Sequence, residues 1–169
     1  ENAALFCFRG GLRSQTVQSW LATCGYQVPL VNGGYKALRS YLLASLEECL
    51  SELSLIVIGG RTGVAKTALL NQACDTLSCP VVDLEGLAHH RGSAFGKRAK
   101  SQPTQINFEY HIAIELLKLR ACGHQHVMME DESRLIGRCA LPLTLQEKLR
   151  EAPLVMLEAS LEERVHHSW

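Results

Sequence analysis

The sequence predicts an α/β fold with a mainly parallel sheet. Short, mainly apolar runs at residues 55–58, 80–87, 126–129 and 154–157, the second of them ending in acids, are separated by segments in which apolar side chains have helical spacing. Runs without polar alternation are typical of strands buried on both faces. Repeated strand–helix units place parallel strands side by side through right-handed crossovers. With 169 residues, 47% of them hydrophobic, the chain is large enough for one domain or two small ones.

The first of these strands leads into a glycine-rich loop at residues 59–65 and then a helix that opens with Lys66 and Thr67. Strand, loop and helix in this order are the context of a phosphate-binding P-loop. Backbone N–H groups and the helix N-terminus surround the anion, while Lys66 adds charge and Thr67 offers a hydroxyl to Mg²⁺. The alternative is an ordinary glycine turn. The predicted phosphate- or diphosphate-binding residues are Gly60, Gly63, Lys66 and Thr67.

One position departs from the P-loop pattern Gly-x-x-x-x-Gly-Lys-Thr. Gly60 is in place, but Ala65 stands where the second glycine belongs. If this residue needs a positive φ, its Cβ makes the conformation costly. The departure puts the affinity for phosphate in question.

Net charge, apolar content and the number of cysteines limit the partners and the cellular compartment that we expect. Formal net charge is zero, so a nucleic-acid partner would have to bind a local basic patch. No apolar run is long enough to span a membrane. The seven cysteines form no paired framework, which favours reduced thiols in the cytoplasm. The chain opens on Glu1 rather than methionine, and we expect a fragment of a longer protein.

A second loop carries a candidate nucleophile. An apolar run at residues 3–6 leads to Cys7, and a helix follows with Ser14 as its expected N-cap. A helix N-terminus and the neighbouring Arg9 and Arg13 are conditions that lower the pKa of a thiol. We therefore predict Cys7, Arg9 and Arg13 as catalytic residues. The alternative is a buried structural cysteine, which is how we interpret the other six.

The spacing around Cys7 has two interpretations. Residues 7–13 match Cys-x-x-Gly-x-x-Arg, the signature of cysteine-dependent phosphatases. Residues 24–38 instead resemble the end of a rhodanese domain, where a short strand leads to a Gly-Gly turn and a closing helix, here expected at 35–53. Rhodaneses carry sulfur or selenium on the loop cysteine. We expect residues 1–50 to be the C-terminal portion of a rhodanese-like domain and residues 54–169 an incomplete P-loop domain.

Two polar stretches follow strands of the predicted P-loop domain. The loop at 88–98 is basic, and open α/β sheets bind ligands at such strand ends, so Arg91, Lys97 and Arg98 are candidates for binding oxyanions. A solvated surface is the alternative. After a helix at 103–120 and the strand at 126–129, the acids at 130–132 could bind the Mg²⁺ that accompanies a P-loop phosphate, with Thr67 and Asp131 as ligands. A solvated turn is as good an explanation.

Five motifs occur together in one order: CFRGGLRSQ, NGGYKALR, GGRTG-x-x-KT, DLEGLAHHRGSAFG and EDESRLIG. In this combination the chain resembles the bacterial tRNA 2-selenouridine synthase family, in which a rhodanese domain is fused to a P-loop domain. The resemblance covers nearly the whole chain and corresponds to the middle of the family's proteins.

The resemblance implies a transferase that acts on tRNA. It replaces the sulfur of 2-thiouridine at the wobble position with selenium from selenophosphate, after S-alkylation by geranyl diphosphate. Cys7 then serves selenium transfer, the P-loop holds a diphosphate, and Arg91, Lys97 and Arg98 contact tRNA phosphates. Mg²⁺ is a possible ion, and we expect no organic cofactor. Two other classes stay open: a kinase or ATPase with a degenerate rhodanese module, and a sulfurtransferase or phosphatase with a regulatory P-loop.

Overall fold

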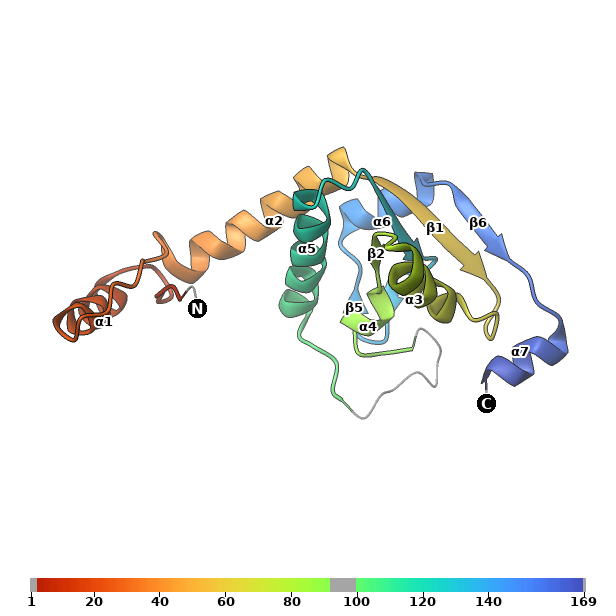
Figure 1. Cartoon of the computed structure of the whole chain (residues 1–169), viewed down its shortest axis with the longest axis horizontal. Coiled ribbons are helices and arrows are strands. Elements are labelled where there is room, and N and C mark those ends of the chain that lie inside the picture. The colour runs from red at the N-terminus through yellow and green to blue at the C-terminus, as the bar shows by residue number, and fades with distance from the viewer. Residues whose placement is uncertain (1–2, 92–99, 169) are drawn as a thin grey trace. The chain divides into compact units, whose positions relative to one another are not determined.

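The computed structural model describes residues 3–91 and 100–168, and the chain divides into two compact units, Glu1–Ala44 and Ser45–Trp169 (Figure 1). The division falls inside helix α2 (Gly34–Glu52). The last turns of α2 belong to the second unit because Leu46, Cys49 and Leu50 are buried there. Across the described residues, the helices are too short or too polar to cross a membrane.

The first unit contains helix α1 (Leu12–Thr23) and the start of α2. The strand predicted at residues 3–6 is reduced to one parallel bridge, Leu5 to Leu30. Helix α1 begins at Leu12 with Gly11 as its N-cap, so the prediction that Ser14 is the N-cap is wrong. Helix α1 leaves a large apolar side chain in contact with solvent, since Trp20 is 66% exposed.

The second unit is built on a parallel sheet. Within the described residues its strands are β1 (Ser54–Gly60), β2 (Val81–Val82), β3 (His126–Glu130) and β6 (Leu154–Leu157), in the order β2-β3-β1-β6. This confirms the predicted α/β class with a parallel sheet. In the register of β1 and β3, Ile58 lies opposite Glu130. The carboxyl ends of the P-loop strand and the acid-bearing strand therefore meet at one edge of the sheet.

Helices α3 (Lys66–Leu77), α5 (Gln105–Ala121) and α6 (Leu143–Glu151) pack against the sheet. Helix α4 (Leu84–Leu87) packs on α5, and α7 (Leu161–Ser168) contacts the loop after β1. Helix α3 lies in front of the sheet in Figure 1 and α6 behind it, as right-handed crossovers in opposite directions require. The core includes the buried Phe108, Ile112 and Leu116 of α5 and the alternating Val127 and Met129 of β3.

The second strand is shorter than the sequence predicts, because Asp83 stops it. The Asp83 Oδ1 atom accepts a hydrogen bond of 2.7 Å from the backbone N–H of Gly86 and thereby caps α4. Residues 84–87 are consequently helical.

Two elements were not predicted from the sequence: helix α6, and a hairpin of β4 (Leu135–Ile136) with β5 (Cys139–Ala140).

Candidate functional site

The first unit holds Cys7 in a loop that stabilises a thiolate. The backbone N–H of Gly11 donates to Cys7 Sγ over 3.2 Å, and Ser14 Oγ lies 3.4 Å from the same sulfur. The pKa of Cys7 is lowered to about 6, mainly by the hydrogen bond from the Ser14 hydroxyl. Partial burial raises this pKa, and the backbone N–H groups of Ser14, Arg9 and Gly11 lower it further. Cys7 is therefore mostly ionised at neutral pH.

The Ser14 hydroxyl has two acceptors within reach. Its Oγ lies 2.9 Å from the carbonyl oxygen of Gly11 as well as 3.4 Å from Cys7 Sγ. A hydroxyl has one proton, so it serves one acceptor at a time. Ionisation of Cys7 makes the sulfur the stronger acceptor, because hydrogen bonds to charged groups are stronger. Ser14 is itself only 4% exposed, which fixes its position beneath the sulfur.

The loop is held from the other side by the Gly-Gly turn at the start of α2. The backbone N–H groups of Tyr35 and Lys36 donate to the carbonyl oxygens of Cys7 and Phe8, over 2.9 and 3.1 Å. Gly34 has φ +62°, and a Cβ on it would collide with the Cys7 carbonyl oxygen. Glycine is required at this position both for its backbone conformation and for the close approach.

The two predicted arginines contribute less to the thiolate than expected. Arg9 assists Cys7 through its backbone N–H, and the side chains of Arg9 and Arg13 are exposed. Neither guanidinium is among the causes of the lowered Cys7 pKa. Their assignment as catalytic residues stays a prediction, concerning substrate oxyanions rather than the thiol. Sequence reasoning missed the role of Ser14, although the motif contains it.

We expect Ser14→Ala to raise the Cys7 pKa from about 6 towards 9.0, the ordinary value for a thiol. The thiolate is the reactive form, so alkylation of Cys7 by iodoacetamide should rise with pH around a midpoint near 6 in the parent. The midpoint is measured by peptide-resolved mass spectrometry. Ser19→Ala is the control, since Ser19 Oγ donates to Gln15 within α1. Equal midpoints in Ser14→Ala and the parent would contradict the assignment.

The second unit forms the P-loop between β1 and α3. Ala65, the N-cap of α3, has φ 61° and ψ 36°, a left-handed conformation that favours glycine. The P-loop pattern has a glycine at this position, and the backbone of Ala65 does adopt the positive φ for which glycine is preferred. The Lys66 Nζ atom donates to the carbonyl oxygen of Gly60 over 3.1 Å and so lies across the loop. Helix α7 contacts the loop as well: Arg164 Nε donates to Thr62 O over 2.9 Å.

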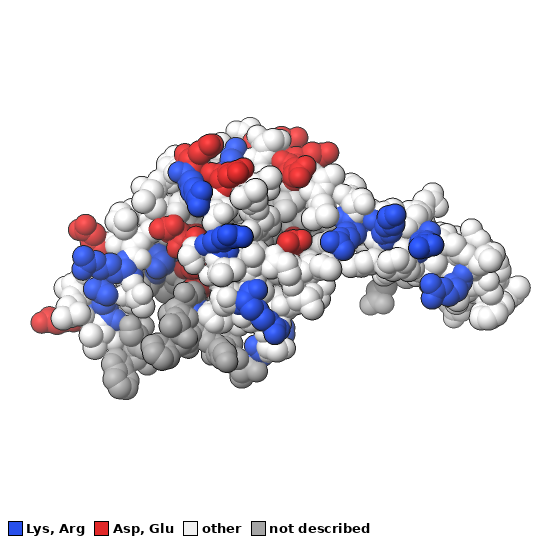
Figure 2. Space-filling model, turned by 180° about the vertical axis from the view of Figure 1, so that it is seen from behind, with Lys and Arg blue, Asp and Glu red and all other residues white. Residues whose placement is uncertain are grey.

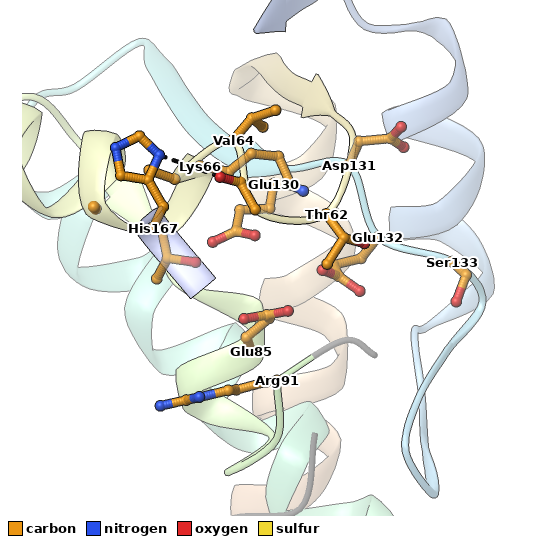
Figure 3. A pocket seen from close by; sticks show the side chains of 14 residues that line it. Thr62, Val64, Lys66, Glu85, Arg91, Glu130, Asp131, Glu132, Ser133 and His167 are labelled. Atoms are coloured by element: carbon orange, nitrogen blue, oxygen red, sulfur yellow. Dashed lines mark hydrogen bonds between the residues drawn. The ribbon is translucent and has the colours of Figure 1, made fainter. Parts of the chain in front are cut away.

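A cavity of about 770 Å³ opens at the P-loop. Figure 3 shows side chains from β3, α4, α7 and the P-loop turned towards it. The lining residues are Thr62, Gly63, Val64, Ala65, Lys66, Thr67, Ala68, Glu85, Arg91, Glu130, Asp131, Glu132, Ser133 and His167. Of the predicted anion-binding residues, Gly63, Lys66, Thr67 and Arg91 meet here. Lys97 and Arg98 lie outside the described residues.

Three carboxylates converge beside the P-loop. Glu85, Glu130 and Glu132 each offer an oxygen within 4.8 Å of the others, and Figure 3 shows them facing one another. Burial, followed by the charges of Glu85 and Glu130, raises the pKa of Glu132 to about 7. Glu130 is 1% exposed, and its Oε1 atom has no hydrogen-bond partner among the described residues. Oxygen ligands with a buried unpaired acceptor fit a hard divalent cation such as Mg²⁺.

The three clustered carboxylates, Glu85, Glu130 and Glu132, do not include Asp131, the acid that the sequence analysis proposed as a Mg²⁺ ligand. Asp131 lines the cavity but is exposed and lies outside the three-carboxylate group. Glu130 instead hydrogen-bonds to Thr67, the predicted hydroxyl ligand. Mg²⁺ binding by Thr67 and Asp131 stays a prediction. Strand register was the usable signal, because Glu130 ends β3 opposite Ile58 of β1.

We expect Ala65→Gly to stabilise the chain. Removing the Cβ relieves a left-handed strain of about 1–2 kcal/mol, and the extra freedom of glycine in the unfolded chain returns about half of it. The net gain in the free energy of unfolding should be up to about 1 kcal/mol by urea denaturation. Ala73→Gly, inside α3, should lower it by about 1 kcal/mol. A loss of stability in Ala65→Gly would show that the loop is not strained.

Comparison with known proteins decides the family. The family model for the tRNA 2-selenouridine synthase AAA domain matches residues 53–169. The chain belongs to this family. A tRNA 2-selenouridine synthase of Pseudomonas syringae pv. syringae (strain B728a) is 55% identical over 161 residues, which are 95% of this chain and 43% of that protein. Another, of Alcanivorax borkumensis, is 52% identical, covering 97% of this chain and 44% of that protein.

The chain thus spans less than half the length of the curated relatives that it matches. Among solved structures, a crystal structure of a DNA replication initiation factor matches with a TM-score of 0.37 and 18% identity, over 78% of this chain and 48% of that one. A likeness this weak says nothing about function.

Proposed function

We propose that this chain is part of an enzyme that replaces the sulfur of 2-thiouridine in tRNA with selenium. The observation that carries the proposal is the extent of the match. Relatives named tRNA 2-selenouridine synthase align with 95% and 97% of the chain, so the match extends over most of both units. The two units then have separate roles, since the first supplies a thiolate and the second binds an anion.

The P-loop suits the first step, transfer of a geranyl group from geranyl diphosphate. The thiouridine sulfur attacks the allylic carbon, the carbon–oxygen bond breaks, and diphosphate leaves with both bonding electrons. A thiocarbonyl sulfur is a poor leaving group, and alkylation makes it a good one. The proposal assigns to the N–H groups at the start of α3 and to the Lys66 ammonium, both at the cavity, the stabilisation of the negative charge that develops on the departing diphosphate.

Mg²⁺ fits the same cavity. Glu85, Glu130, Glu132 and the Thr67 hydroxyl are the residues that would hold it, and when bound it would neutralise part of the diphosphate charge. Without a cation these carboxylates repel one another and the anion. The buried Glu130, whose pKa is raised mainly by burial, is the residue most in need of a positive partner.

The Cys7 thiolate suits the second step, in which selenium replaces the alkylated sulfur. Selenium in selenophosphate is already at the oxidation level of selenide, so a perselenide on Cys7 would require an oxidant. A redox-neutral role is nucleophilic catalysis. The thiolate adds to C2 of the alkylated base, and geranylthiolate leaves and takes a proton. The selenium of selenophosphate then attacks C2 and displaces the Cys7 thiolate, and water cleaves the P–Se bond to release phosphate and leave the selenocarbonyl. A pKa of about 6 gives Cys7 both the ionised form needed to attack and the acidity of a good leaving group.

Mg²⁺ should raise the melting temperature of the chain through the three glutamates. At a Mg²⁺ concentration about 100 times the Kd, binding adds about 2.7 kcal/mol to the free energy of unfolding. Glu130→Gln should abolish this gain in a thermal-shift titration against NaCl of equal ionic strength. Asp131→Asn and the exposed Glu147→Gln should keep it. If Asp131→Asn lost the Mg²⁺-dependent rise in melting temperature and Glu130→Gln kept it, Asp131 and not Glu130 would be the Mg²⁺ ligand.

The two units should fail at different steps when their reactive residues are replaced in the full-length protein. Lys66→Ala should block geranylation of 2-thiouridine in tRNA yet allow selenation of pre-geranylated tRNA. Cys7→Ala should do the reverse, and 2-selenouridine should fall below detection. Each substrate is supplied separately, and both nucleosides are measured by mass spectrometry. Lys148→Ala and the exposed Cys24→Ala are the controls. Equal loss of both steps in either test variant would refute this division of labour.

A further inference from the structure

A second cavity, of about 470 Å³, lies in the unit that carries the P-loop and shares no lining residue with the first among the residues that the structure describes. Three short segments form it: the end of the α4 turn, the chain just before α5, and the turn of the β4–β5 hairpin. Its lining residues are His89, His90, Lys100, Ser101, Gln102, Gly137 and Arg138. No Asp or Glu is among these described residues. The P-loop cavity, by contrast, is lined by four carboxylates.

The walls of this cavity are fixed by the side-chain amide of Gln102. Its Nε2 donates to the carbonyl oxygens of Ile136 and Ala88, over 2.9 and 3.2 Å, and its Oε1 accepts from the backbone N–H of Arg138 over 3.0 Å. A Cβ on Gly137 would collide with this amide. One glutamine therefore joins all three segments and holds the cavity open before any ligand arrives.

The charged groups of the cavity are also held in place. Arg138 Nη2 donates to the Gln102 carbonyl oxygen over 2.6 Å, which orients the guanidinium while leaving its other N–H groups for a ligand. Lys100 is exposed at the rim. His89 adopts a left-handed conformation, with φ 51°, and its Nδ1 atom lies 2.9 Å from the carbonyl oxygen of Ser101.

His90 supplies an independent sign that something binds here. It is only 7% exposed, and its Nδ1 atom has no hydrogen-bond partner among the described residues. Buried polar atoms in folded proteins are nearly always paired. An imidazole N–H, a guanidinium and an ammonium, with no acid among the described lining residues, make up a donor set for an oxyanion. Phosphate is the anion that such sets bind best.

We propose that this cavity binds a backbone phosphate of the RNA substrate. The inference rests on the proposed function, which supplies a polyanionic substrate to a chain of zero formal net charge. Binding must then be local, and Figure 2 shows lysine and arginine side chains in separate small clusters on the face in view. A volume of about 470 Å³ is in the range that accommodates a nucleotide unit. The acid-lined P-loop cavity would repel an RNA phosphate.

The test is a double variant, Lys100→Gln with Arg138→Gln, in the full-length protein. Its affinity for tRNA should fall on the order of tenfold, since a hydrogen bond to a charged group is lost. The slope of log K against log salt should drop by about 1 to 2, because fewer counterions are released. The matched control, Lys148→Gln with Arg150→Gln, removes the same charge from α6.

His90 gives a second measurement. In His90→Asn, an amide N–H stands where Nδ1 was, so tRNA affinity should be retained. His90→Leu fills similar space without a donor, and affinity should fall. Circular dichroism and melting curves establish that each variant is folded. The charge variants test the proposal even if His90→Leu fails to fold.

The possible results distinguish failure of the RNA-phosphate assignment for this cavity from failure of the proposed tRNA function. Parent-like affinity and salt slope in the double variant would overturn the pocket assignment and leave the tRNA function standing. Inorganic phosphate that binds through Lys100 and Arg138 without displacing tRNA would assign the cavity to a small phosphate compound and overturn the RNA assignment. Failure of the unaltered protein to bind tRNA at low salt would refute the proposed function itself.

Discussion

The parallel pairing of β1 with β3 is the constraint on which the P-loop site depends. It places Ile58 opposite Glu130, so the loop that follows β1 and the acids that follow β3 leave the same edge of the sheet. The pairing is secured by apolar burial, with Leu55, Val57, Val127 and Met129 all nearly inaccessible to water. Hydrophobic packing thereby supports the position of Glu130, a carboxylate that burial alone would disfavour. A register shift of one residue would turn Glu130 to the opposite face.

Both units present backbone N–H groups to a place where a negative charge is found or proposed: the Cys7 thiolate, to which the Ser14 hydroxyl contributes most, and the proposed diphosphate at the start of α3. The Cys7 sulfur accepts from Gly11 N–H and is supported by Ser14, while the P-loop presents the start of α3, entered through a left-handed Ala65. Backbone donors cost little side-chain entropy and are fixed by the fold, so they are in place before charge develops. They also demand unusual backbone conformations, which explains the clustering of glycine in both loops.

The sequence predicted the elements that local rules control and missed those set by distant contacts. The strand at 154–157 and the helix beginning at Lys66 were predicted correctly, because apolar runs and the lysine–threonine pair are local signals. The role of Ser14 was missed since its hydroxyl reaches a sulfur seven residues earlier as well as the carbonyl oxygen of Gly11, a contact that helix-capping rules do not contain. Asp131 was singled out from the acids at 130–132, which were all expected to follow the strand, whereas the strand in fact extends to Glu130 and buries it. The convergence of Glu85 with Glu130 and Glu132 depends on the sheet order, which no local pattern contains.

Under the proposed function, the distribution of charge within the second unit would suit each cavity to a different anion. The carboxylates around the P-loop repel an anion that has no bound cation. The proposed diphosphate with Mg²⁺ would therefore bind there in preference to an RNA phosphate without a metal. The cavity at Gln102 has cations and no acid among its described lining residues, which is the composition that the proposed phosphodiester, carrying no metal, requires. On this proposal, a chain of zero formal net charge would distinguish two phosphate-bearing substrates by the local composition of its cavities. The sorting requires both cavities to be rigid, and the Gln102 amide and the β1–β3 pairing supply that rigidity separately.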